Sequence, residues 1–429
     1  MTYSTIETSD RERLHELQSE RLRDIVTYAH ENVPFYREVL KEAGLSPGDI
    51  DGIEDCARLP FTTKEDFRVE FPDGLFAVDW DAVQRVHASS GTTGTPKIVS
   101  YTDADLGIWR SVMARSLASA GVTENDVVQN AYGYGLFTGG LGFHDGCEEL
   151  GATVVPVGGG NTARQIELLV DLGCDVLACT PSYCLYLAEE MERRSIDPHG
   201  LPLSTVLIGA EPFTDPMREE IEAALGVTAI DVYGLSEIIG PGVSIECAAA
   251  QDGLHVWEDH FYPEIIDPET GEVLPDGEQG ELVLTTLTKE ALPLLRYRTG
   301  DITSLTREPC ACGRTHARMD NVTGRTDDLL IVRGVNVYAS QIEATMLDIP
   351  EVAPHYRIDL SREGALDRIE ITAEHHERYE DDLTALETRI LERLNAILDL
   401  TPDAITVVEP DTIERTETGK VQRVFDHRS

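Results

Sequence analysis

Short runs rich in β-branched residues alternate with helical stretches between positions 126 and 232, and this alternation constrains the fold more than any other feature. Apolar residues recur at helical spacing in the stretches between the runs. Such alternation is typical of an α/β fold with a largely parallel sheet. The predicted strands are 126–130, 152–157, 176–179, 205–207 and 229–232, and the predicted helices are 162–172, 182–195 and 216–225.

The chain on either side of this region predicts further units. Apolar spacing over 11–43 predicts helices interrupted at Pro34, and a helix cap is predicted just before Lys64. After Gly253, a turn over 267–272 separates predicted strands at 261–266 and 280–286. This pattern indicates a β-subdomain at about 245–323 within a large N-terminal domain, residues 1–323.

From position 324 onward the pattern changes to a separate α+β unit of about a hundred residues. Its predicted strands are 328–332 and 404–408, and its predicted helices are 340–347 and 382–398. We therefore expect a small C-terminal domain, residues 324–429, joined to the α/β domain near Arg325.

Acidic residues dominate the charge along the whole chain. The sequence has 35 Lys and Arg against 78 Asp and Glu, a formal net charge of −43. Such a surface repels the phosphates of nucleic acids and anionic lipids, so neither class of partner is expected. An excess of this size is typical of proteins adapted to high salt, where counterions screen the self-repulsion.

We predict that the protein loses stability below molar salt. The Debye length falls from about 30 Å at 0.01 M to about 3 Å at 1 M salt, which removes most of the repulsion between exposed carboxylates. The melting temperature should therefore rise with KCl concentration in a series of thermal unfolding curves. A melting temperature that stays constant over that range contradicts the prediction.

Hydropathy and cysteine usage favour the cytoplasm. No apolar run approaches the roughly 20 residues that a membrane helix requires. Residues 1–10 are polar and lack the basic segment and apolar core of a secretory signal. The eight cysteines are scattered, as in reduced cytosolic proteins.

A glycine- and hydroxyl-rich segment follows the β-compatible run 83–87. Its glycines let the backbone approach phosphate oxygens, its hydroxyl groups can donate hydrogen bonds, and its lysine supplies positive charge. The spacing differs from that of a Walker A loop. We predict a phosphate-binding loop, and a plain surface loop of the same composition is the alternative. The residues are Ser89, Ser90, Gly91, Thr92, Thr93, Gly94, Thr95, Pro96 and Lys97.

Further motifs follow this loop in the order found in adenylate-forming enzymes, the superfamily of acyl-CoA synthetases, luciferases and peptide-synthetase adenylation domains. Together with the loop they resemble that superfamily, and matches in one order are far more specific than any single match. The motifs are Tyr233-Gly234-Leu235-Ser236-Glu237, the ribose-binding Tyr297-Arg298-Thr299-Gly300-Asp301, the hinge Gly324-Arg325-Thr326-Asp327 and the terminal Thr418-Gly419-Lys420.

Within the superfamily, the chain from Arg21 onward most resembles the phenylacetate-CoA ligases. The resemblance lies in the compact length and in the segments 255–262, 285–293, 333–337 and 340–343. It implies an AMP-forming ligase that uses ATP, Mg²⁺ and coenzyme A to activate an aromatic acid, with phenylacetate as the first candidate. It also implies a mobile C-terminal lid.

The resemblance assigns nucleotide-binding roles to the matched residues. Asp301 would accept hydrogen bonds from both ribose hydroxyls, because an ionised carboxylate is only an acceptor. Tyr233 would lie against adenine, and Glu237 would bind Mg²⁺, a hard ion that prefers oxygen ligands. The rest of the implied ATP site is the phosphate loop with Gly209, Ala210, Glu211, Gly234, Ser236 and Arg325.

The resemblance also implies two half-reactions with different needs. Lys420 would be the catalytic lysine, with its cation between the acyl carboxylate and the α-phosphate, where two anions meet. After pyrophosphate leaves, the lid would turn at Asp327. Arg333 and Gly334 would then close on coenzyme A.

An aromatic and glycine-rich segment over 131–140 suits a flat apolar ligand. We predict that Tyr134, Phe137 and Gly139 line the acid pocket and that Leu235 belongs to its other wall. Close packing of a loop against the core explains the same composition.

Cys310 and Cys312 offer two thiolates within one short segment. Structural zinc needs four ligands, and Cys247 and His255, where the β-subdomain begins, are the candidates for the other two. Buried reduced cysteines are the alternative, because the spacing is less regular than paired C-x-x-C motifs.

Several alternatives stay open. The acid could be benzoate, aminobenzoate or indoleacetate, or the enzyme could adenylylate a deazaflavin cofactor. A non-catalytic ATP-binding protein is disfavoured because the lysines, Glu237 and Asp301 occur together, and a carrier-protein adenylation module is disfavoured because no carrier segment follows Lys420. The sequence decides neither the oligomeric state, a homodimer being one option, nor the resting position of the lid.

Overall fold

The computed structural model describes residues 2–88, 97–326, 329–333, 335–363, 366–376, 379, 382–398, 400–414 and 423–428. The chain begins with helices. The Asp10 side chain caps the first helix, Pro34 starts the second because its ring cannot continue the first, and Thr63 caps the third. The predicted break at Pro34 and the predicted cap are confirmed. The helices are α1 (Arg11–Asn32), α2 (Pro34–Glu42) and α3 (Lys64–Val69).

A nine-stranded sheet forms the centre of the N-terminal part, in the order β13-β14-β9-β8-β7-β6-β5-β3-β4. Its strands β4, β3, β5, β6 and β7 pair in parallel, as the alternation predicted. These strands are β3 (Val127–Asn130), β4 (Thr153–Val155), β5 (Val176–Cys179), β6 (Thr205–Gly209) and β7 (Thr228–Leu235).

Helices cover both faces of the parallel strands. Because side chains alternate along a strand, Val176 and Ala178 of β5 join the core under α4 and α5, whereas Leu177 and Cys179 join the core under α6, α7 and α8. The helices are α4 (Asp103–Ser119), α5 (Gly139–Leu150), α6 (Thr162–Asp171), α7 (Pro181–Arg193) and α8 (Asp215–Leu225).

Antiparallel strands complete the N-terminal part, so the large sheet is mixed. They extend this sheet as β8 (Gly240–Glu246), β9 (Leu254–Val256), β14 (Arg318–Met319) and β13 (Leu305–Thr306). A second sheet contains both predicted hairpin strands, in the order β10 (Phe261–Ile266), β11 (Gly280–Thr286), β12 (Tyr297–Thr303) and β15 (Gly324–Arg325). A two-stranded pair consists of β1 (Arg85–Ala88) and β2 (Ile98–Tyr101).

The C-terminal part has its own sheet and its own apolar core. Strands β20, β19, β18 and β21 lie in that order, and the core residues run from Leu330 to Val407. The predicted helices and strands of this part are confirmed. The elements are β16 (Leu329–Val332), β17 (Val335–Tyr338), α9 (Ala339–Leu347), β18 (Val352–Glu363), β19 (Leu366–His375), α10 (Leu383–Ile397), β20 (Ala404–Val408) and β21 (Val424–Asp426).

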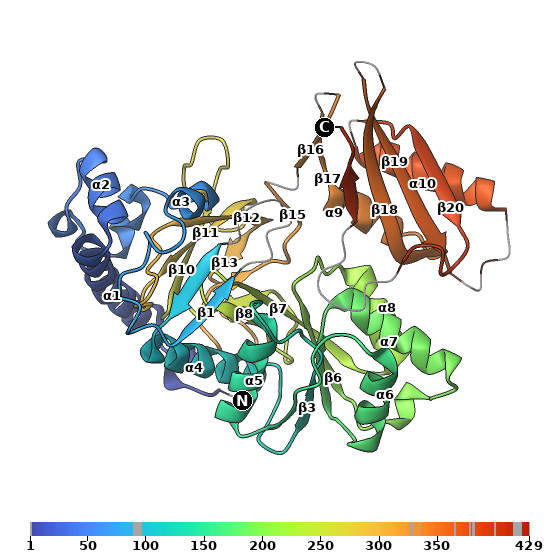
Figure 1. Cartoon of the computed structure of the whole chain (residues 1–429), viewed down its shortest axis with the longest axis horizontal. Helices are drawn as coiled ribbons and strands as arrows, with labels where there is room; N and C mark the ends of the chain where they lie inside the picture. The colour runs from blue at the N-terminus through green and yellow to red at the C-terminus, as the bar shows by residue number, and fades with distance from the viewer. Residues whose placement is uncertain are drawn as a thin grey trace.

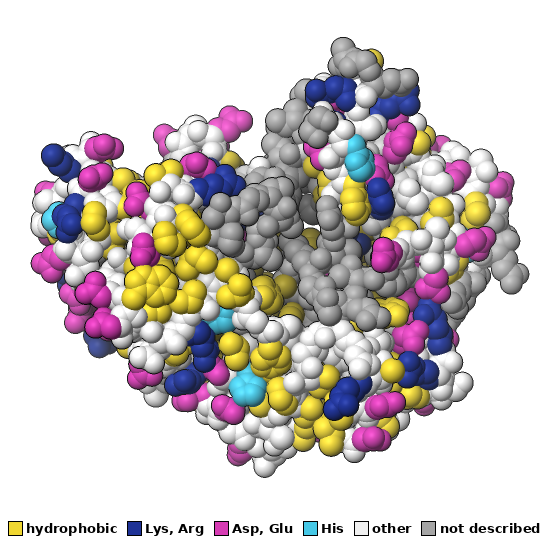
Figure 2. All heavy atoms as spheres, in the orientation of Figure 1, with side chains coloured by type: hydrophobic (Ala, Val, Ile, Leu, Met, Phe, Trp, Pro, Cys, Tyr) yellow, Lys and Arg dark blue, Asp and Glu magenta, His cyan; other side chains and the backbone are white. Residues whose placement is uncertain are grey.

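Figure 1 shows this C-terminal part, in orange and red, beside α7 and α8. Charged pairs join them: Arg193 of α7 donates to both carboxylate oxygens of Asp411 at 2.9 and 3.0 Å, and His355 of β18 lies 3.3 Å from Glu189. Figure 2 shows Asp and Glu side chains spread over the visible face, consistent with the acidic composition. Among the described residues, no helix has the length and apolar character needed to span a membrane.

Candidate active site

Asp301 is the buried centre of a polar cluster built by three strands. Asp301 on β12 lies opposite Arg325 on β15, and the two side chains form an ion pair. The hydroxyl of Tyr233, from β7, donates to Asp301 Oδ2 at 2.6 Å, and Arg325 also donates to Thr299 O at 3.1 Å. Burial and the Asp301 charge raise the pKa of Tyr233, so its hydroxyl stays a donor.

Glu237 is the buried carboxylate of a second polar cluster, on the turn between β7 and β8. It forms an ion pair with Lys97 and accepts a hydrogen bond from the Tyr297 hydroxyl at 3.0 Å. Burial acts most strongly and raises the pKa of Glu237, but the Lys97 charge and the hydrogen bonds from Lys97, Tyr297 and the backbone together outweigh it. The pKa therefore lies below its usual value. The structure therefore joins two residues, Lys97 and Glu237, that the sequence placed far apart.

The segment from Gly209 to Glu211 begins at the last residue of β6, at the carboxyl end of the parallel strands, where ligands bind in α/β sheets. A Cβ atom on Gly209 would lie 2.1 Å from Val232 O, so only glycine lets β6 approach β7 here. Ala210 adopts a left-handed conformation with φ of 70°. The Glu211 carboxylate accepts hydrogen bonds from Ser182 Oγ at 2.6 Å and Ser182 N at 3.2 Å, which fixes the segment to the start of α7.

The predicted acid-pocket residues lie in two segments that contact each other. Ser236 Oγ lies 3.1 Å from Thr138 Oγ1, which places the Phe137–Gly139 stretch beside the turn after Leu235. The Phe137 ring is 38% exposed, and it would lie 2.4 Å from a Cβ atom on Gly139.

Two other members of these segments are fixed by their surroundings. The Tyr134 hydroxyl accepts from Asn130 Nδ2 at 2.8 Å and lies 3.2 Å from His144 Nδ1. Leu235 packs at the edge of the main core, and a Cβ atom on Gly234 would lie 2.0 Å from Gly240 O. The end of β7, which carries Leu235, therefore requires glycine at position 234.

Several predicted residues lie outside the described part of the chain: Ser89, Ser90, Gly91, Thr92, Thr93, Gly94, Asp327, Gly334 and Lys420. Arg333 is described and has a φ of 53°. It donates to Thr401 O at 2.8 Å and Asp403 Oδ2 at 3.2 Å, both in the C-terminal part. Arg333 is therefore held within that part in this structure.

The four predicted metal ligands come together. The ligand atoms of Cys247, His255, Cys310 and Cys312 all lie within 4.8 Å of one another. Cys247 Sγ is 3.8 Å from Cys310 Sγ, and Cys312 Sγ is 3.4 Å from His255 Nε2. Residues from β9 and from the loops after β8 and β13 thus converge on one point.

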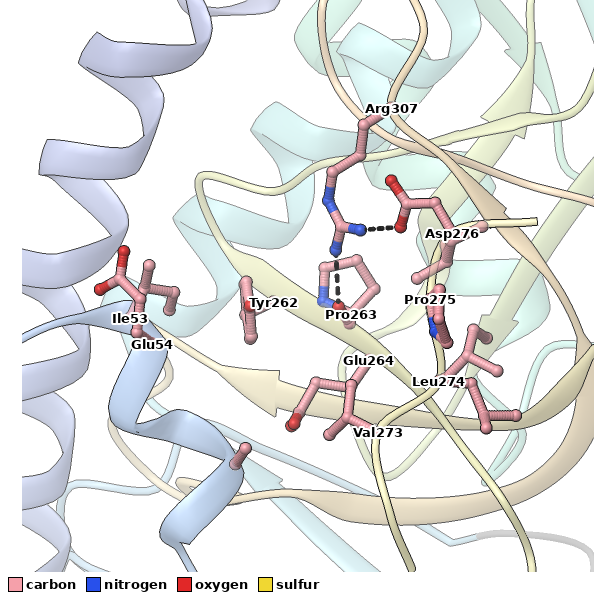
Figure 3. A pocket seen from close by; sticks show the side chains of 13 residues that line it. Ile53, Glu54, Tyr262, Pro263, Glu264, Val273, Leu274, Pro275, Asp276 and Arg307 are labelled. Carbon is pink, nitrogen blue, oxygen red and sulfur yellow. Dashed lines mark hydrogen bonds and ion pairs between the residues drawn. The ribbon is translucent and has the colours of Figure 1, made fainter. Parts of the chain in front are cut away.

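A separate cavity of about 350 Å³ lies between the segment around Ile53 and strand β10 (Figure 3). Arg307 lies at this cavity, where it pairs with Asp276 and donates to Pro263 O at 3.4 Å. Its lining contains none of the residues that the sequence predicted for ATP, acid or coenzyme A. This cavity is therefore distinct from the candidate active site.

Sequence reasoning missed Lys289 and Tyr101, which contact the turn that carries Glu237. Lys289 is 3% exposed, and its Nζ donates to Glu237 O at 3.0 Å. Burial lowers the pKa of Lys289 to about 8, although Asp105 and Glu237 act in the opposite direction. The available signal for Lys289 was its place in the segment 285–293, which carries part of the family resemblance, whereas no sequence feature marked Tyr101.

Comparison with known families and proteins agrees with the motifs. The family described as AMP-binding enzyme matches residues 7–287, and the AMP-binding enzyme C-terminal domain matches residues 334–428. The phenylacetate-coenzyme A ligase of Thermus thermophilus is 52% identical, with 99% of this chain and 98% of that protein covered. The phenylacetate-coenzyme A ligase of Escherichia coli is 46% identical, with coverage of 99% and 97%.

Solved structures of 2-hydroxyisobutyryl-CoA ligase are similar over the whole chain. A structure in the postadenylation state matches with a TM-score of 0.91 at 28% identity, and covers 98% of this chain and 91% of that protein. A structure with coenzyme A in the thioesterification state matches with a TM-score of 0.74 at 29% identity and the same coverage.

Proposed function

The chain belongs to the phenylacetate-coenzyme A ligase family of AMP-binding enzymes, and from this membership we propose a role for each part of its site. The protein is an AMP-forming acid–thiol ligase that adenylates phenylacetate with ATP and transfers the acyl group to coenzyme A. The observation that carries this conclusion is 52% identity over 99% of the chain.

Asp301 is assigned to the ribose of ATP. Its carboxylate can accept hydrogen bonds from both ribose hydroxyls, and Tyr233 and Arg325 hold the two oxygens in place beforehand. Tyr233 has two functions in this assignment: its hydroxyl orients Asp301, and its ring packs against adenine. The backbone of Gly209, Ala210 and Glu211 forms the other wall.

Glu237 is assigned to Mg²⁺. Its buried carboxylate already binds a cationic group and a hydroxyl, which fits a hard divalent ion that prefers carboxylate oxygen. When bound, Mg²⁺ neutralises charge on the phosphates of ATP. Lys97 and the loop from Ser89 to Gly94 are assigned to the β- and γ-phosphates, and Ser236 and Gly234 shape the turn that presents Glu237.

The C-terminal part, residues 324–429, is assigned the role of a lid that turns at Asp327. The similarity is higher to the postadenylation structure than to the thioesterification structure, which supports a lid position like that of the postadenylation state. The Arg193–Asp411 pair crosses between lid and body in this position. Lys420 is assigned to the α-phosphate. In the second position, Arg333 and Gly334 are assigned to coenzyme A.

The phenylacetate ring is assigned to the pocket beside Tyr134, Phe137, Gly139 and Leu235. We expect phenylacetate to give the highest kcat/KM in a panel with benzoate, aminobenzoate and indoleacetate. A narrow pocket bounded by glycines accepts a flat phenyl ring that is joined to its carboxylate by one methylene group. The measurements are pyrophosphate release and mass-spectrometric detection of the CoA thioester, in molar KCl with Mg²⁺. Preference for another acid, or absence of AMP, contradicts this assignment.

We also propose that the Cys/His cluster binds a structural zinc ion. With Zn–S distances of about 2.3 Å, tetrahedral coordination separates two sulfurs by about 3.8 Å. The Cys247 and Cys310 sulfurs are 3.8 Å apart, so their spacing fits the metal. We also propose a cytoplasmic location. Every cysteine of the chain is a free thiol in the structure, which fits a reducing compartment.

The zinc site would also secure the N-terminus. The loop that carries Cys310 and Cys312 continues into Arg314, which forms a fully buried ion pair with Glu7 at 2.7 Å. Thr315 N donates to Glu7 O at 3.0 Å. Metal binding at the loop therefore stabilises the packing of the first residues of the chain.

Replacing Cys312 with serine should lower the zinc content from about one ion per chain to nearly none, because a closed site needs all four ligands. Proteolysis near the segment before Arg11 should accelerate and the melting temperature should fall. Cys147→Ala, at a buried cysteine of α5 outside the cluster, is the matched control and should keep its zinc. Elemental analysis that finds no zinc in the wild-type protein refutes the proposal.

A further inference from the structure

The turn that carries Glu237 is held by its backbone carbonyls from two sides. Lys289 Nζ donates to Glu237 O at 3.0 Å. The Tyr101 hydroxyl donates to Ile239 O at 2.9 Å and lies 3.2 Å from Ser236 O. The Glu237 side chain has separate partners, Lys97 and Tyr297, so the backbone of the turn and the carboxylate are fixed by different groups.

Lys289 and Tyr101 also contact each other. The ammonium group of Lys289 lies 4.7 Å from the centre of the Tyr101 ring, within the range of a cation–π interaction. Both residues are buried, with 3% and 0% exposure. A buried ammonium group is costly unless its hydrogen bonds and charge are compensated, and the carbonyl and the ring both face it here. The two side chains form one unit under the turn.

Asp105 fixes the backbone from which Lys289 extends. Its carboxylate accepts from Glu290 N at 2.7 Å and Ala291 N at 2.9 Å, and it also accepts from Thr102 N at 2.9 Å in the capping box of α4. Asp105 is 1% exposed. The start of α4, the segment around Lys289 and the turn around Glu237 are therefore joined by a continuous chain of buried hydrogen bonds.

We propose that Lys289 and Tyr101 are positioning residues for the adenylation reaction: together they hold the Ser236–Ile239 turn so that the Glu237 carboxylate is presented in the orientation that binds the metal ion of Mg·ATP. This proposal rests on the assignment of Glu237 to Mg²⁺. Neither side chain touches the reacting atoms in this scheme. Both act through the backbone of one turn.

Substitutions that remove each contact separately test the proposal. Lys289→Met keeps the length of the side chain but removes the donor and the charge, and Tyr101→Phe keeps the ring but removes the hydroxyl. Lys289→Met should weaken Mn²⁺ binding in the presence of a non-hydrolysable ATP analogue by between about tenfold and a hundredfold, the loss typical when a group that orients a metal ligand is removed. Tyr101→Phe should weaken Mn²⁺ binding less than Lys289→Met does. Lys289→Arg keeps a charged donor and should therefore bind Mn²⁺ more tightly than Lys289→Met.

The control is a substitution of another buried cation that also faces an aromatic ring but does not contact the Glu237 turn. Arg115 lies 5.0 Å from the centre of the Trp257 ring and pairs with Asp259, away from Glu237. Arg115→Met should lower the melting temperature and leave Mn²⁺ affinity unchanged, which separates loss of stability from loss of metal positioning. Wild-type Mn²⁺ affinity in folded Lys289→Met overturns the proposal. Wild-type affinity in Glu237→Gln instead overturns the assignment of Glu237, so the two failures are distinguishable.

Discussion

Replacing Lys420 with alanine is expected to lower the rate of acid-dependent pyrophosphate exchange by about 10²- to 10³-fold, the loss typical for removal of one charge-stabilising donor. Thioester formation from supplied phenylacetyl-adenylate should stay close to the wild-type rate, because in the proposed scheme the lid turns at Asp327 before this step and withdraws Lys420 from the substrate. The measurements are isotope exchange between pyrophosphate and ATP for the first step, and chromatography of the CoA thioester for the second.

The position of Lys420 makes a control necessary, since any change in the lid could affect its closure. Arg393→Ala removes an exposed cation from α10 of the C-terminal part and should change neither half-reaction. Equal loss of both half-reactions in Lys420→Ala would show that a single lid position serves both steps. That result would contradict both the assignment of Asp327 as a hinge and the assignment of Lys420 to the first half-reaction alone.

Glu237→Gln should lower kcat/KM for Mg·ATP by about 10²- to 10³-fold, corresponding to a few kcal/mol of lost metal-ion stabilisation. The amide keeps the shape of the side chain and its contact with Tyr297, but it cannot supply the negative charge that the metal requires. Raising the Mg²⁺ concentration should recover part of the rate, and initial rates over a Mg²⁺ series measure this recovery.

Tyr297→Phe is the matched control for Glu237→Gln, because it removes a hydrogen bond from the same carboxylate without changing its charge. We expect a much smaller loss in this variant. If the two variants lose activity equally, the carboxylate acts through its hydrogen bond and the assignment to Mg²⁺ is wrong. The melting temperature of Glu237→Gln should also be measured, since the substitution leaves Lys97 without its carboxylate partner.

Most of the fold could be predicted from the sequence. Many helices bury one apolar face, which gives a helical spacing of apolar residues, and helices and strands alternate along the chain between positions 126 and 232. The amphipathic helices α6, α7 and α8 were found from their apolar spacing, and the parallel strands between them were found as short runs rich in β-branched residues. Helix α4 was missed because its second half is buried on every side, from Val112 to Ser119, so no apolar period marks it.

Helix α5 was missed for a different reason, because its glycines are typical of a loop. A Cβ atom on Gly142 would lie 2.5 Å from Pro241 Cγ, and one on Gly146 would lie 2.5 Å from Met113 Cβ. The glycines therefore allow close packing against α4 and β8, which the sequence of α5 alone does not reveal. Close approach between elements is a tertiary property.

The candidate site also contains residues that the sequence reveals and residues that only the folded structure reveals. Motif residues such as Asp301 and Glu237 could be found because their spacing is recognisable in one dimension. Lys289 and Tyr101 could not, since their partners are backbone carbonyls, which every residue possesses. Only the folded arrangement shows which carbonyl a buried side chain reaches.

In the Lys97–Glu237 ion pair, the ammonium group already neutralises the carboxylate of the residue that is assigned to Mg²⁺. A free divalent ion would have to displace this ammonium group from a buried carboxylate, whereas an ion that arrives on a triphosphate brings a new anion for the ammonium group. Metal and nucleotide are therefore expected to arrive as one complex, and magnesium without ATP should be a poor ligand even at millimolar concentration.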